Sequence, residues 1–479
     1  MSTVERDTTP RSTGAAPHAV PAEIDAPPEA LPHRRLIFAI VSIALFMTSV
    51  DQTIVATALP AIEHDFRAHI NWSGWTITIY ALGQVLAMPL AGKISDQFGR
   101  KKVFLISAVV FTLASLSCGF ATNIETLVVL RAVQAIGGGA FMPSATGIVS
   151  DHFGKDRDRA LGMFASIFPI GGIVGPIIGG AFVAAWSWRG IFLVNVPIGI
   201  ALIALAVIFI PTSRTRVTSR TDLRGVLLLG VLILSAMFGI TYLGSATTSL
   251  ISPVFLVSEA IAVVAGWLFF RHANRYPTPF IPIRLLRGRG FGTMNLINLL
   301  YGAAALGFGA LVPLYAEDRF GIKPLAAGTL LTARAVGMIC VAALAVAALR
   351  RTGYRLPMIV GFITVFVGLI VMSLTPRGLS PYLWLAVAAA VTGLGMGMSV
   401  PASNNASLQL APDQVAAIAG LRGMFRQSGA IMAVSITTTV VARSAHPGIA
   451  QAHIFVIFAI LLIATLPLVF LVPDHRGSW

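Results

Sequence analysis

Residues 36–59 read LIFAIVSIALFMTSVDQTIVATAL, an apolar run whose one charged residue is Asp51. It directly follows Arg34 and Arg35. About 20 apolar residues in a helix cross the ~30 Å of hydrocarbon in a bilayer, because each residue adds ~1.5 Å. The run is too long for the core of a secretory signal peptide, and many similar runs follow it. This stretch therefore predicts a retained first transmembrane helix.

The whole chain has the composition of a membrane protein. Of its 479 residues, 56% are hydrophobic and 11% are charged, whereas soluble domains carry about 25% charged residues. A soluble fold would also need polar outer helix faces, which are missing here. We predict an all-α membrane protein with fourteen transmembrane helices. Their expected ranges are 36–59, 72–91, 103–121, 126–149, 160–184, 190–210, 224–243, 252–271, 291–315, 325–349, 356–375, 382–406, 416–442 and 450–472.

The net charge of +15 would suggest nucleic-acid binding in a soluble protein, but here the basic residues gather in one set of loops. Most of them lie in loops that follow even-numbered predicted helices. These residues are Lys93, Arg100, Lys101, Lys102, Lys155, Arg157, Arg159, Arg214, Arg216, Arg220, Arg271, Arg275, Arg284, Arg287, Arg289, Arg350, Arg351 and Arg355. The positive-inside rule then places both termini in the cytoplasm of a multi-pass protein of the plasma (inner) membrane.

The organisation of the chain indicates an internal duplication. Three glycines near the second predicted helix return at a constant offset in the second half. They are Gly74, Gly83 and Gly99, followed by Gly328, Gly337 and Gly353. We expect a disordered cytoplasmic tail at 1–33, six-helix bundles at 34–210 and 291–479, and an inserted two-helix hairpin with basic loops at 211–290.

The loop between the second and third predicted helices reads GKISDQFGRKK at 92–102. Gly99 permits a tight turn, and Asp96 with the basic cluster can pair with neighbouring helix ends. A basic loop that only sets topology is the alternative interpretation. The segment closely resembles the loop signature of the major facilitator superfamily. This resemblance implies a cytoplasmic gate formed by Gly92, Asp96, Gly99, Arg100 and Lys101. In the second half Arg350 stands where Asp96 stands in the first, which puts a matching gate there in doubt.

Three further segments resemble one branch of that superfamily. Residues 171–180, GGIVGPIIGG, are similar to the antiporter motif of exporters, with close helix packing as the plain alternative. The motif residues are Gly171, Gly175, Pro176, Gly179 and Gly180. Residues 50–60 and 188–197 look like motifs of the fourteen-helix drug:proton antiporter subfamily. The resemblance implies two six-helix halves plus an inserted helix pair, and multidrug efflux driven by protons.

Six ionisable residues fall well inside predicted spans, away from their ends. They are Asp51, Arg131, Glu259, Arg334, Arg422 and Arg426. A charge at the centre of a bilayer costs about 2.5–3.5 kcal/mol on an insertion scale, so these residues must pair or line a wet cavity.

Asp51 is our candidate for the group that carries the proton. Arg131 lies at a similar depth in the fourth predicted helix, and Gln134 shares its helix face. A guanidinium lowers the pKa of a nearby carboxyl while desolvation raises it, so a change in this balance could load and release a proton. The alternatives are a static ion pair for Asp51 and an arginine that snorkels to the outer interface.

The other four buried charges are candidates for a substrate cavity. Glu259 either faces a lateral opening or substrate, or pairs within the inserted hairpin. Arg426 is similar to the family's pattern in helix 13, whereas Arg422 departs from it. Arg334 lies near the centre of its predicted helix. Because arginines outnumber carboxylates, an anionic, zwitterionic or lipid-like substrate stays open.

Other function classes lack support in the sequence. Neither Gly92-Lys93 nor Gly154-Lys155 is followed by Ser or Thr, so a nucleotide-binding P-loop is absent. The histidines lie in the tail, loops and helix ends, which argues against a metal site or an embedded enzyme.

We expect no cofactor other than protons as coupling ion, a small lipophilic substrate, membrane lipids as partners and a monomer. Export of an endogenous lipid, siderophore or natural product is the main alternative, ahead of an uptake symporter or a membrane receptor.

Overall fold

The computed structural model describes most of the chain as helices. The described residues are 33–67, 70–212, 222–243, 251–277, 279, 281–287, 290–376, 378–410, 414–442, 444–472 and 474. The expected tail lies outside these residues, except for His33.

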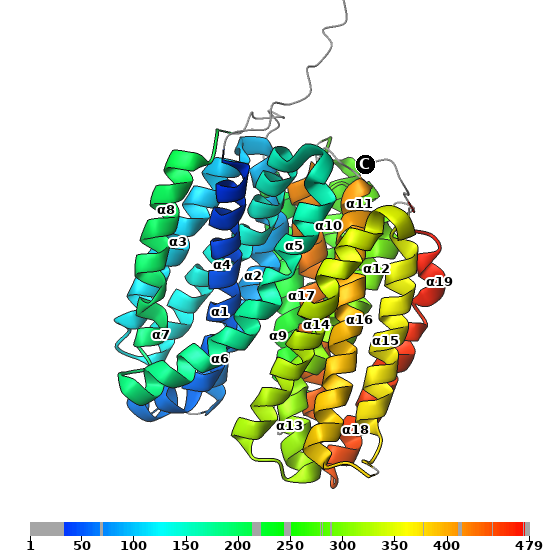
Figure 1. Cartoon of the computed structure of the whole chain (residues 1–479). Coiled ribbons are helices and arrows are strands. Elements are labelled where there is room, and N and C mark those ends of the chain that lie inside the picture. Colours follow the sequence, from blue (N-terminus) through cyan, green and yellow to red (C-terminus); the bar gives the residue numbers. More distant parts are fainter. Residues whose placement is uncertain are drawn as a thin grey trace, which may run out of the picture. The chain divides into compact units, whose positions relative to one another are not determined.

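The helices before residue 210 form an N-terminal group (Figure 1). It consists of α1 (Arg34–Phe66), α2 (Ile70–Phe98), α3 (Arg100–Gly119), α4 (Ile124–Phe153), α5 (Arg157–Ala165), α6 (Ile167–Ala185), α7 (Gly190–Leu193) and α8 (Asn195–Phe209). A hairpin follows, made of α9 (Leu223–Leu243) and α10 (Pro253–Arg275), and then the short α11 (Ile283–Arg287).

The helices after residue 290 form a C-terminal group. It consists of α12 (Phe291–Tyr301), the π-helix η2 (Gly302–Gly307), α13 (Phe308–Phe320), α14 (Pro324–Thr352), α15 (Arg355–Ser373), α16 (Pro381–Gln409), α17 (Val415–Ala442), α18 (Pro447–Ile463) and α19 (Leu466–Val469). Buried apolar residues of α12 to α19 gather in a cluster of their own, while α17 also contributes to the main cluster of the N-terminal group.

Eleven helices in the described part of the chain are long and apolar enough to cross a membrane. The predicted count of fourteen is therefore not confirmed. The expected span at 291–315 is divided by the π-helix, the apolar part of α9 is the shorter stretch Arg224–Ile240, and α17 carries Arg422 and Arg426. The expected single helices at 160–184 and 190–210 are each built from two pieces, which break at Ser166 and Val194.

Local sequence explains several helix boundaries. The side chain of Asn123 accepts a hydrogen bond from the backbone N–H of Thr126 and so caps the start of α4. Proline occupies the first turn of α10, α14, α16 and α18, where a missing N–H leaves no partner unsatisfied. Gly99, between α2 and α3, has a φ of 100°, which confirms the expected tight turn.

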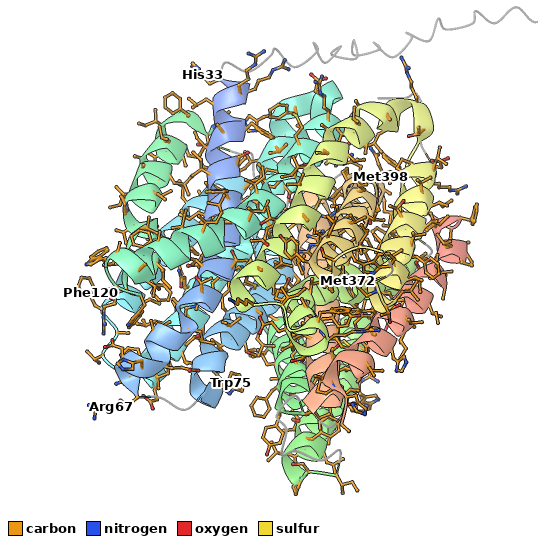
Figure 2. All side chains as sticks on the ribbon, turned by 60° about the horizontal axis from the view of Figure 1, so that its bottom comes forward. His33, Arg67, Trp75, Phe120, Met372 and Met398 are labelled. Carbon is orange, nitrogen blue, oxygen red and sulfur yellow. The ribbon has the colours of Figure 1, made fainter. Side chains whose placement is uncertain are left out.

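The two ends of the bundle differ in their loops. We call the end that carries residues 98–100, 153–157 and 352–355 the basic end, and the other the opposite end. Figure 2 shows His33 and Arg67 at the two ends of α1, with Trp75 near the Arg67 end. In Figure 1 the ribbons of the two groups meet at the basic end and diverge toward the opposite end.

Contacts between the two groups are formed near the basic end. A Cβ atom on Gly92 of α2 would lie 2.4 Å from the backbone carbonyl oxygen of Ala416 in α17. Across a second seam, Tyr354 donates a hydrogen bond to Asp158 Oδ2 at 2.9 Å. Burial raises the pKa of Tyr354 above its ordinary value, so its hydroxyl keeps the proton that it donates. These contacts hold the described arrangement closed at this end.

Candidate functional site

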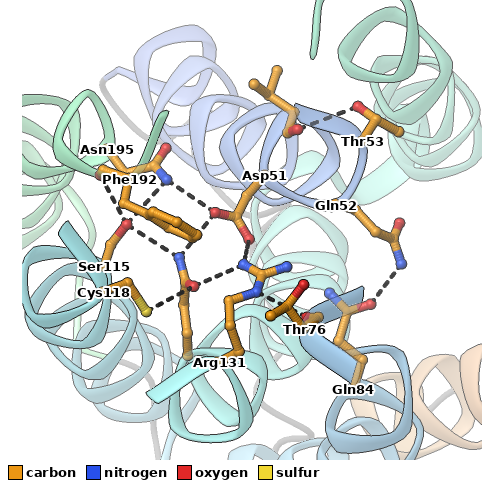
Figure 3. A network of polar contacts seen from close by, with 12 residues as sticks. Asp51, Gln52, Thr53, Thr76, Gln84, Ser115, Cys118, Arg131, Phe192 and Asn195 are labelled. Carbon is orange, nitrogen blue, oxygen red and sulfur yellow. Dashed lines mark hydrogen bonds and ion pairs between the residues drawn. The ribbon is translucent and has the colours of Figure 1, made fainter. Parts of the chain in front are cut away.

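An ion pair inside the N-terminal group joins α1 to α4. Arg131 Nη1 donates to Asp51 Oδ2 at 2.7 Å (Figure 3). The two residues are 1% and 0% exposed, so neither meets bulk water or lipid. The two residues that were expected at a similar depth thus meet inside the bundle. The alternative that Arg131 snorkels to the outer interface is wrong, because its charged head is turned toward Asp51 inside the bundle.

Two amides hold the second oxygen of the same carboxylate. Asp51 Oδ1 accepts hydrogen bonds from Gln134 Nε2 at 2.9 Å and from Asn195 Nδ2 at 3.1 Å. Gln134 Oε1 also accepts from Arg131 Nη1 at 2.8 Å, which ties the amide to the ion pair. An ionised carboxylate is a pure acceptor, and all of these partners donate N–H groups. The described geometry thus fits the deprotonated form of Asp51.

Ser115 of α3 lies at the centre of the remaining contacts (Figure 3). Its hydroxyl accepts from Gln134 Nε2 and from Asn195 Nδ2, both at 3.1 Å, and donates to the carbonyl of Phe192 at 2.9 Å. Cys118 Sγ lies 3.8 Å from Gln134 Oε1. The network therefore draws on α1, α3, α4 and the α7–α8 junction, and it lies wholly within the N-terminal group.

The other side of the guanidinium contacts α2. Arg131 Nε donates to the backbone carbonyl of Thr76 at 3.2 Å, and its Cζ lies 3.9 Å from the centre of the Tyr80 ring. Tyr80 is fully buried. A ring face attracts a cation most strongly where water is excluded, so Tyr80 helps to hold the positive charge in the helix core.

A run of glycines on α4 brings these helices close enough for such contacts. A Cβ on Gly137 would lie 2.7 Å from the backbone nitrogen of Phe111 in α3, and one on Gly139 would lie 3.0 Å from the Cα of Gln84 in α2. Any larger residue would push α4 away from its neighbours. Close approach through small residues is the usual way in which membrane helices pack.

The glycine motif of α6 packs against α1. Cβ atoms on Gly171, Gly175 and Gly179 would lie 2.6, 2.1 and 2.2 Å from side-chain atoms of Ser49, Thr53 and Thr57. Cβ atoms on Gly180 and Gly172 would meet nothing within 4 Å, and the side chain of Pro176 lies outside the described residues. Three of the motif residues therefore set the distance between α6 and the helix that carries Asp51.

The loop motif lies at the contact between the two groups. Asp96 Oδ2 accepts a hydrogen bond from the backbone N–H of Ala417 in the first turn of α17, at 3.0 Å. The expected pairing of Asp96 with a neighbouring helix end is therefore present. Arg100 bridges Asp96 at 3.2 Å and Asp151 at 2.6 Å, and Lys101 donates to the carbonyl of Val207. Negative charge at a helix N-terminus is stabilising.

The cavity candidates do not meet at one place. Arg334, Arg422 and Arg426 belong to the C-terminal group, on α14 and α17. Glu259 lies in the hairpin, where a Cβ on Gly239 of α9 would be 2.5 Å from its Oε1. An apolar pocket of about 700 Å³ between α2, α9 and α10 lies beside it, but Glu259 is not one of the lining residues. The alternative interpretation, a charge pair for Glu259 inside the hairpin, is not seen among the described residues, where its Oε1 has no hydrogen-bond partner.

Comparison with known proteins gives the family. The family model of the Major Facilitator Superfamily matches residues 41–434 and also 294–479. The chain belongs to the major facilitator superfamily. This assignment makes it a multi-pass membrane transporter rather than an enzyme.

Curated relatives agree along most of the chain. Multidrug resistance protein 3 of Bacillus subtilis is 28% identical over 401 residues, which cover 83% of this transporter and 78% of that protein. A Multidrug resistance protein B homolog of Mycobacterium tuberculosis is 30% identical over 405 residues, which cover 82% and 75%. Among solved structures, the human organic anion transporter MFSD10 has a TM-score of 0.69 at 16% identity, covering 93% of this chain and 100% of that one. At that identity the likeness shows the fold alone.

The sequence reasoning on this transporter missed part of the network. Asn195 and Ser115 hold the carboxylate and its amide partners, yet neither was chosen as a site residue. Each is a polar side chain in an apolar helix, and that contrast is the signal in the sequence. The structure buries both, with Asn195 2% and Ser115 0% exposed. It did not suffice, because many serines and asparagines in membrane helices bond only to their own backbone.

A second ion pair, at the opposite end, is more exposed to solvent and leads to a first prediction. Asp65 lies beyond the candidate span Arg34–Val55 and accepts hydrogen bonds from Arg189 at 2.6 Å and Trp188 at 3.0 Å. These bonds hold the pKa of Asp65 below its usual range. The pair therefore stabilises the fold above about pH 4, and this contribution is lost as the pH falls through the lowered pKa.

Replacing Asp65 with Asn should lower the free energy of unfolding at pH 7 by no more than about 1 kcal/mol, because the pair is exposed. Melting curves of both proteins should converge as the pH falls through the lowered pKa of Asp65. A difference that grows on acidification would contradict this assignment.

Proposed function

We propose that this transporter exports lipophilic compounds in exchange for protons, by alternating access between its two helix groups. The names of its relatives and the resemblance of its motifs to the fourteen-helix drug:proton antiporter subfamily support the proposal. The observation that carries it is the Asp51 carboxylate, buried at mid-helix and held by one guanidinium and two amides. An ionisable group inside the membrane is costly in free energy, and such groups mark functional sites in membrane proteins.

The chemistry of proton coupling follows from these hydrogen bonds. A proton on Asp51 would remove the negative charge that Arg131 faces, so protonation and the 2.7 Å ion pair exclude each other. Breaking the pair frees the guanidinium to seek a new partner and loosens α1 from α4. Binding of a proton in one conformation and its release in the other then couples proton flow to the rearrangement. Protons are the only coupling ion that this scheme requires.

The direction of transport follows from topology. The positive-inside rule assigns the basic end, and with it both termini, to the cytoplasm of the cell membrane. The described arrangement is then the one closed toward the cytoplasm. We assign the gate to Asp96 with Gly92, Gly99, Arg100 and Lys101, since Asp96 joins α2 to the N-terminus of α17. Inward proton flow down ~100 mV supplies about 2.3 kcal/mol per charge for outward movement of substrate.

The proposed architecture keeps the sequence-based domain boundaries. Bundles at 34–210 and 291–479 would be duplicated six-helix halves that rock against each other, and 211–290 an insertion between them. The glycine motif of α6 would then serve as a close-packed support for α1 while the halves move. A monomer suffices for this scheme, because the network draws on one chain.

The test uses purified protein in acid-loaded liposomes that contain a pH-sensitive dye. The probe is a toxic compound to which cells expressing the protein have become resistant. Its addition should release protons from liposomes with the native protein, and Asp51→Asn should reduce this release at least about tenfold. Asp65→Asn removes an acid from the same helix and should leave it unchanged. Equal proton release from Asp51→Asn would remove Asp51 from the mechanism, and proton uptake with substrate would favour a symporter.

A further inference from the structure

The C-terminal group carries positive charge in its interior, and no acidic residue of the described part of the chain pairs with it. Its acidic residues, from 291 to 479, are Glu317, Asp318, Asp413 and Asp474. Glu317 and Asp318 lie in the last turn of α13, Asp474 follows the last described helix, and Asp413 precedes α17 in the sequence. The group also carries three arginines inside long helices: Arg334 lies in α14, and Arg422 and Arg426 lie in the first half of α17.

Arg422 is the most buried of the three. It is 3% exposed, and its Nε and Nη1 are buried without a hydrogen-bond partner in the described protein. Arg426, four residues further along α17 and therefore on the same helix face, is another cation. A guanidinium does not give up its proton in a protein. A buried and unpaired charge costs several kcal/mol, so this position is unfavourable unless an anion meets it.

Arg426 of α17 and Arg334 of α14 both contact the π-helix that directly follows Tyr301. The backbone of Arg426 packs against Gly302, and Arg334 Nη1 donates to the carbonyl of Ala305. The Ser399 hydroxyl lies 3.2 Å from the Tyr301 hydroxyl and donates its single proton to the backbone carbonyl of Gly395 at 2.8 Å. We call Arg334, Arg422, Arg426 and Tyr301 the arginine cluster. Its residues come from three helices, and none of them is acidic.

The backbone around the cluster is built to hold these donors in place. Tyr301 ends α12 where the π-helix Gly302–Gly307 begins, and Arg334 Nη1 donates to the carbonyl of Ala305 within that π-helix at 3.1 Å. A Cβ on Gly302 would lie 2.0 Å from the carbonyl oxygen of Arg426. The π-helix therefore packs directly on α17. Short π-helical segments inside α-helices are frequent at functional sites.

We propose that the arginine cluster binds the anionic head of an amphipathic organic anion, and that such anions are among the exported substrates. Guanidinium groups suit the oxygens of a carboxylate, sulfonate or phosphate. The second half of the proposal rests on the transport function proposed above. The first half, binding, does not depend on it.

The test measures binding of two probes that share a fluorophore and differ in charge. Pyrenebutyrate and pyrenebutyltrimethylammonium are titrated onto the full chain in phosphatidylcholine nanodiscs, with energy transfer from tryptophan as the signal. Pyrenebutyrate should bind at least about tenfold more tightly than the cation. Arg422→Gln should weaken pyrenebutyrate at least about tenfold, equal to about 1.4 kcal/mol, while Arg422→Lys should retain part of the affinity.

The matched control is Arg351→Gln, which removes an exposed arginine from the end of α14 and should leave both affinities unchanged. Without probe, Arg422→Gln should melt at the same temperature as the native protein or higher, because an unpaired buried charge has been removed. A loss of binding therefore cannot be ascribed to misfolding. Repeating the titration in chloride and in gluconate tests whether the cluster binds an inorganic anion instead. Repeating it in nanodiscs of phosphatidylglycerol and of phosphatidylcholine tests whether it binds a lipid head group instead.

Equal binding of the two probes, or unchanged pyrenebutyrate binding by Arg422→Gln, would overturn the proposal. Competition by chloride or by phosphatidylglycerol at equal strength would also overturn it, by assigning the cluster to those anions. Its failure is distinguishable from failure of the transport scheme. Proton release that depends on Asp51 can persist when pyrenebutyrate does not bind, and binding can persist when proton release is absent.

Discussion

Arg131→Met should lower the free energy of unfolding by about 3–5 kcal/mol at pH 7, because it leaves the Asp51 carboxylate buried without its counter-charge. Gln134 and Asn195 would still donate to that carboxylate, but neutral amides do not replace a guanidinium. The double variant Asp51→Asn with Arg131→Met should recover most of the loss, since it contains no buried charge at the site. Unfolding in detergent, followed by circular dichroism during a denaturant titration, measures both values.

The control for this cycle is Arg189→Met, which breaks the exposed pair with Asp65 and should cost no more than about 1 kcal/mol. The single Arg131→Met variant should also regain stability as the pH falls, because Asp51 can then take up a proton. Equal losses in the single and double variants would contradict the electrostatic account. Such a result would assign the role of Arg131 to its packing against the Tyr80 ring.

Gly420→Ala should shift this transporter away from the described arrangement by about five- to 150-fold in population. A Cβ at position 420 of α17 would lie 2.1 Å from the carbonyl oxygen of Met88 and 3.1 Å from the Cα of Pro89, both in α2. These are backbone atoms, so no rotamer change can relieve the clash. The helices must separate at the basic end, and overpacking of this kind typically costs 1–3 kcal/mol. That cost corresponds to a population change of about five- to 150-fold.

Spin labels at the exposed residues Lys102 and Arg351, one in each helix group, report the separation at the basic end. The labels are introduced on a chain in which the exposed Cys340 is replaced by Ser and the buried Cys118 is kept. The distance distribution of Gly420→Ala should gain a longer component. Gly328→Ala is the matched control, because a Cβ there meets nothing within 4 Å. An unchanged distribution for Gly420→Ala would show that the α2–α17 contact does not hold this end closed.

The effects of Arg131→Met and Gly420→Ala are linked by α2. The same helix provides the Thr76 carbonyl and Tyr80 ring that hold Arg131, and further along it carries Gly92 and Asp96 at the contact with α17. A change in the Asp51 ion pair therefore acts on the helix that closes the basic end. We expect opening at that end and rupture of the ion pair to influence each other through α2.

Much of the charged site could be predicted from helix geometry. The depth of Asp51 and Arg131 follows from counting residues at ~1.5 Å each from the helix ends, and Gln134 follows Arg131 on the same face. The high cost of charge in the membrane required a partner for each. Counting residues could not identify Asn195 or Ser115 as the other partners. Whether the side chains of Ser115 and Asn195 point toward Asp51 and Gln134 depends on how α3 and α8 are rotated about their axes.

The sequence by itself determined that this is a membrane protein made of helices, which residues carry charge inside it, and which loops are basic. Hydrophobic length and charge distribution act locally along the chain, so they can be read without a fold. Only the tertiary structure decided that Asp51 has a charged partner while Arg422 has none among the described residues, and that the two helix groups meet at Gly92 and Gly420. Those facts depend on helix rotation and on backbone approach within a few ångströms, which residues far apart in the sequence set together.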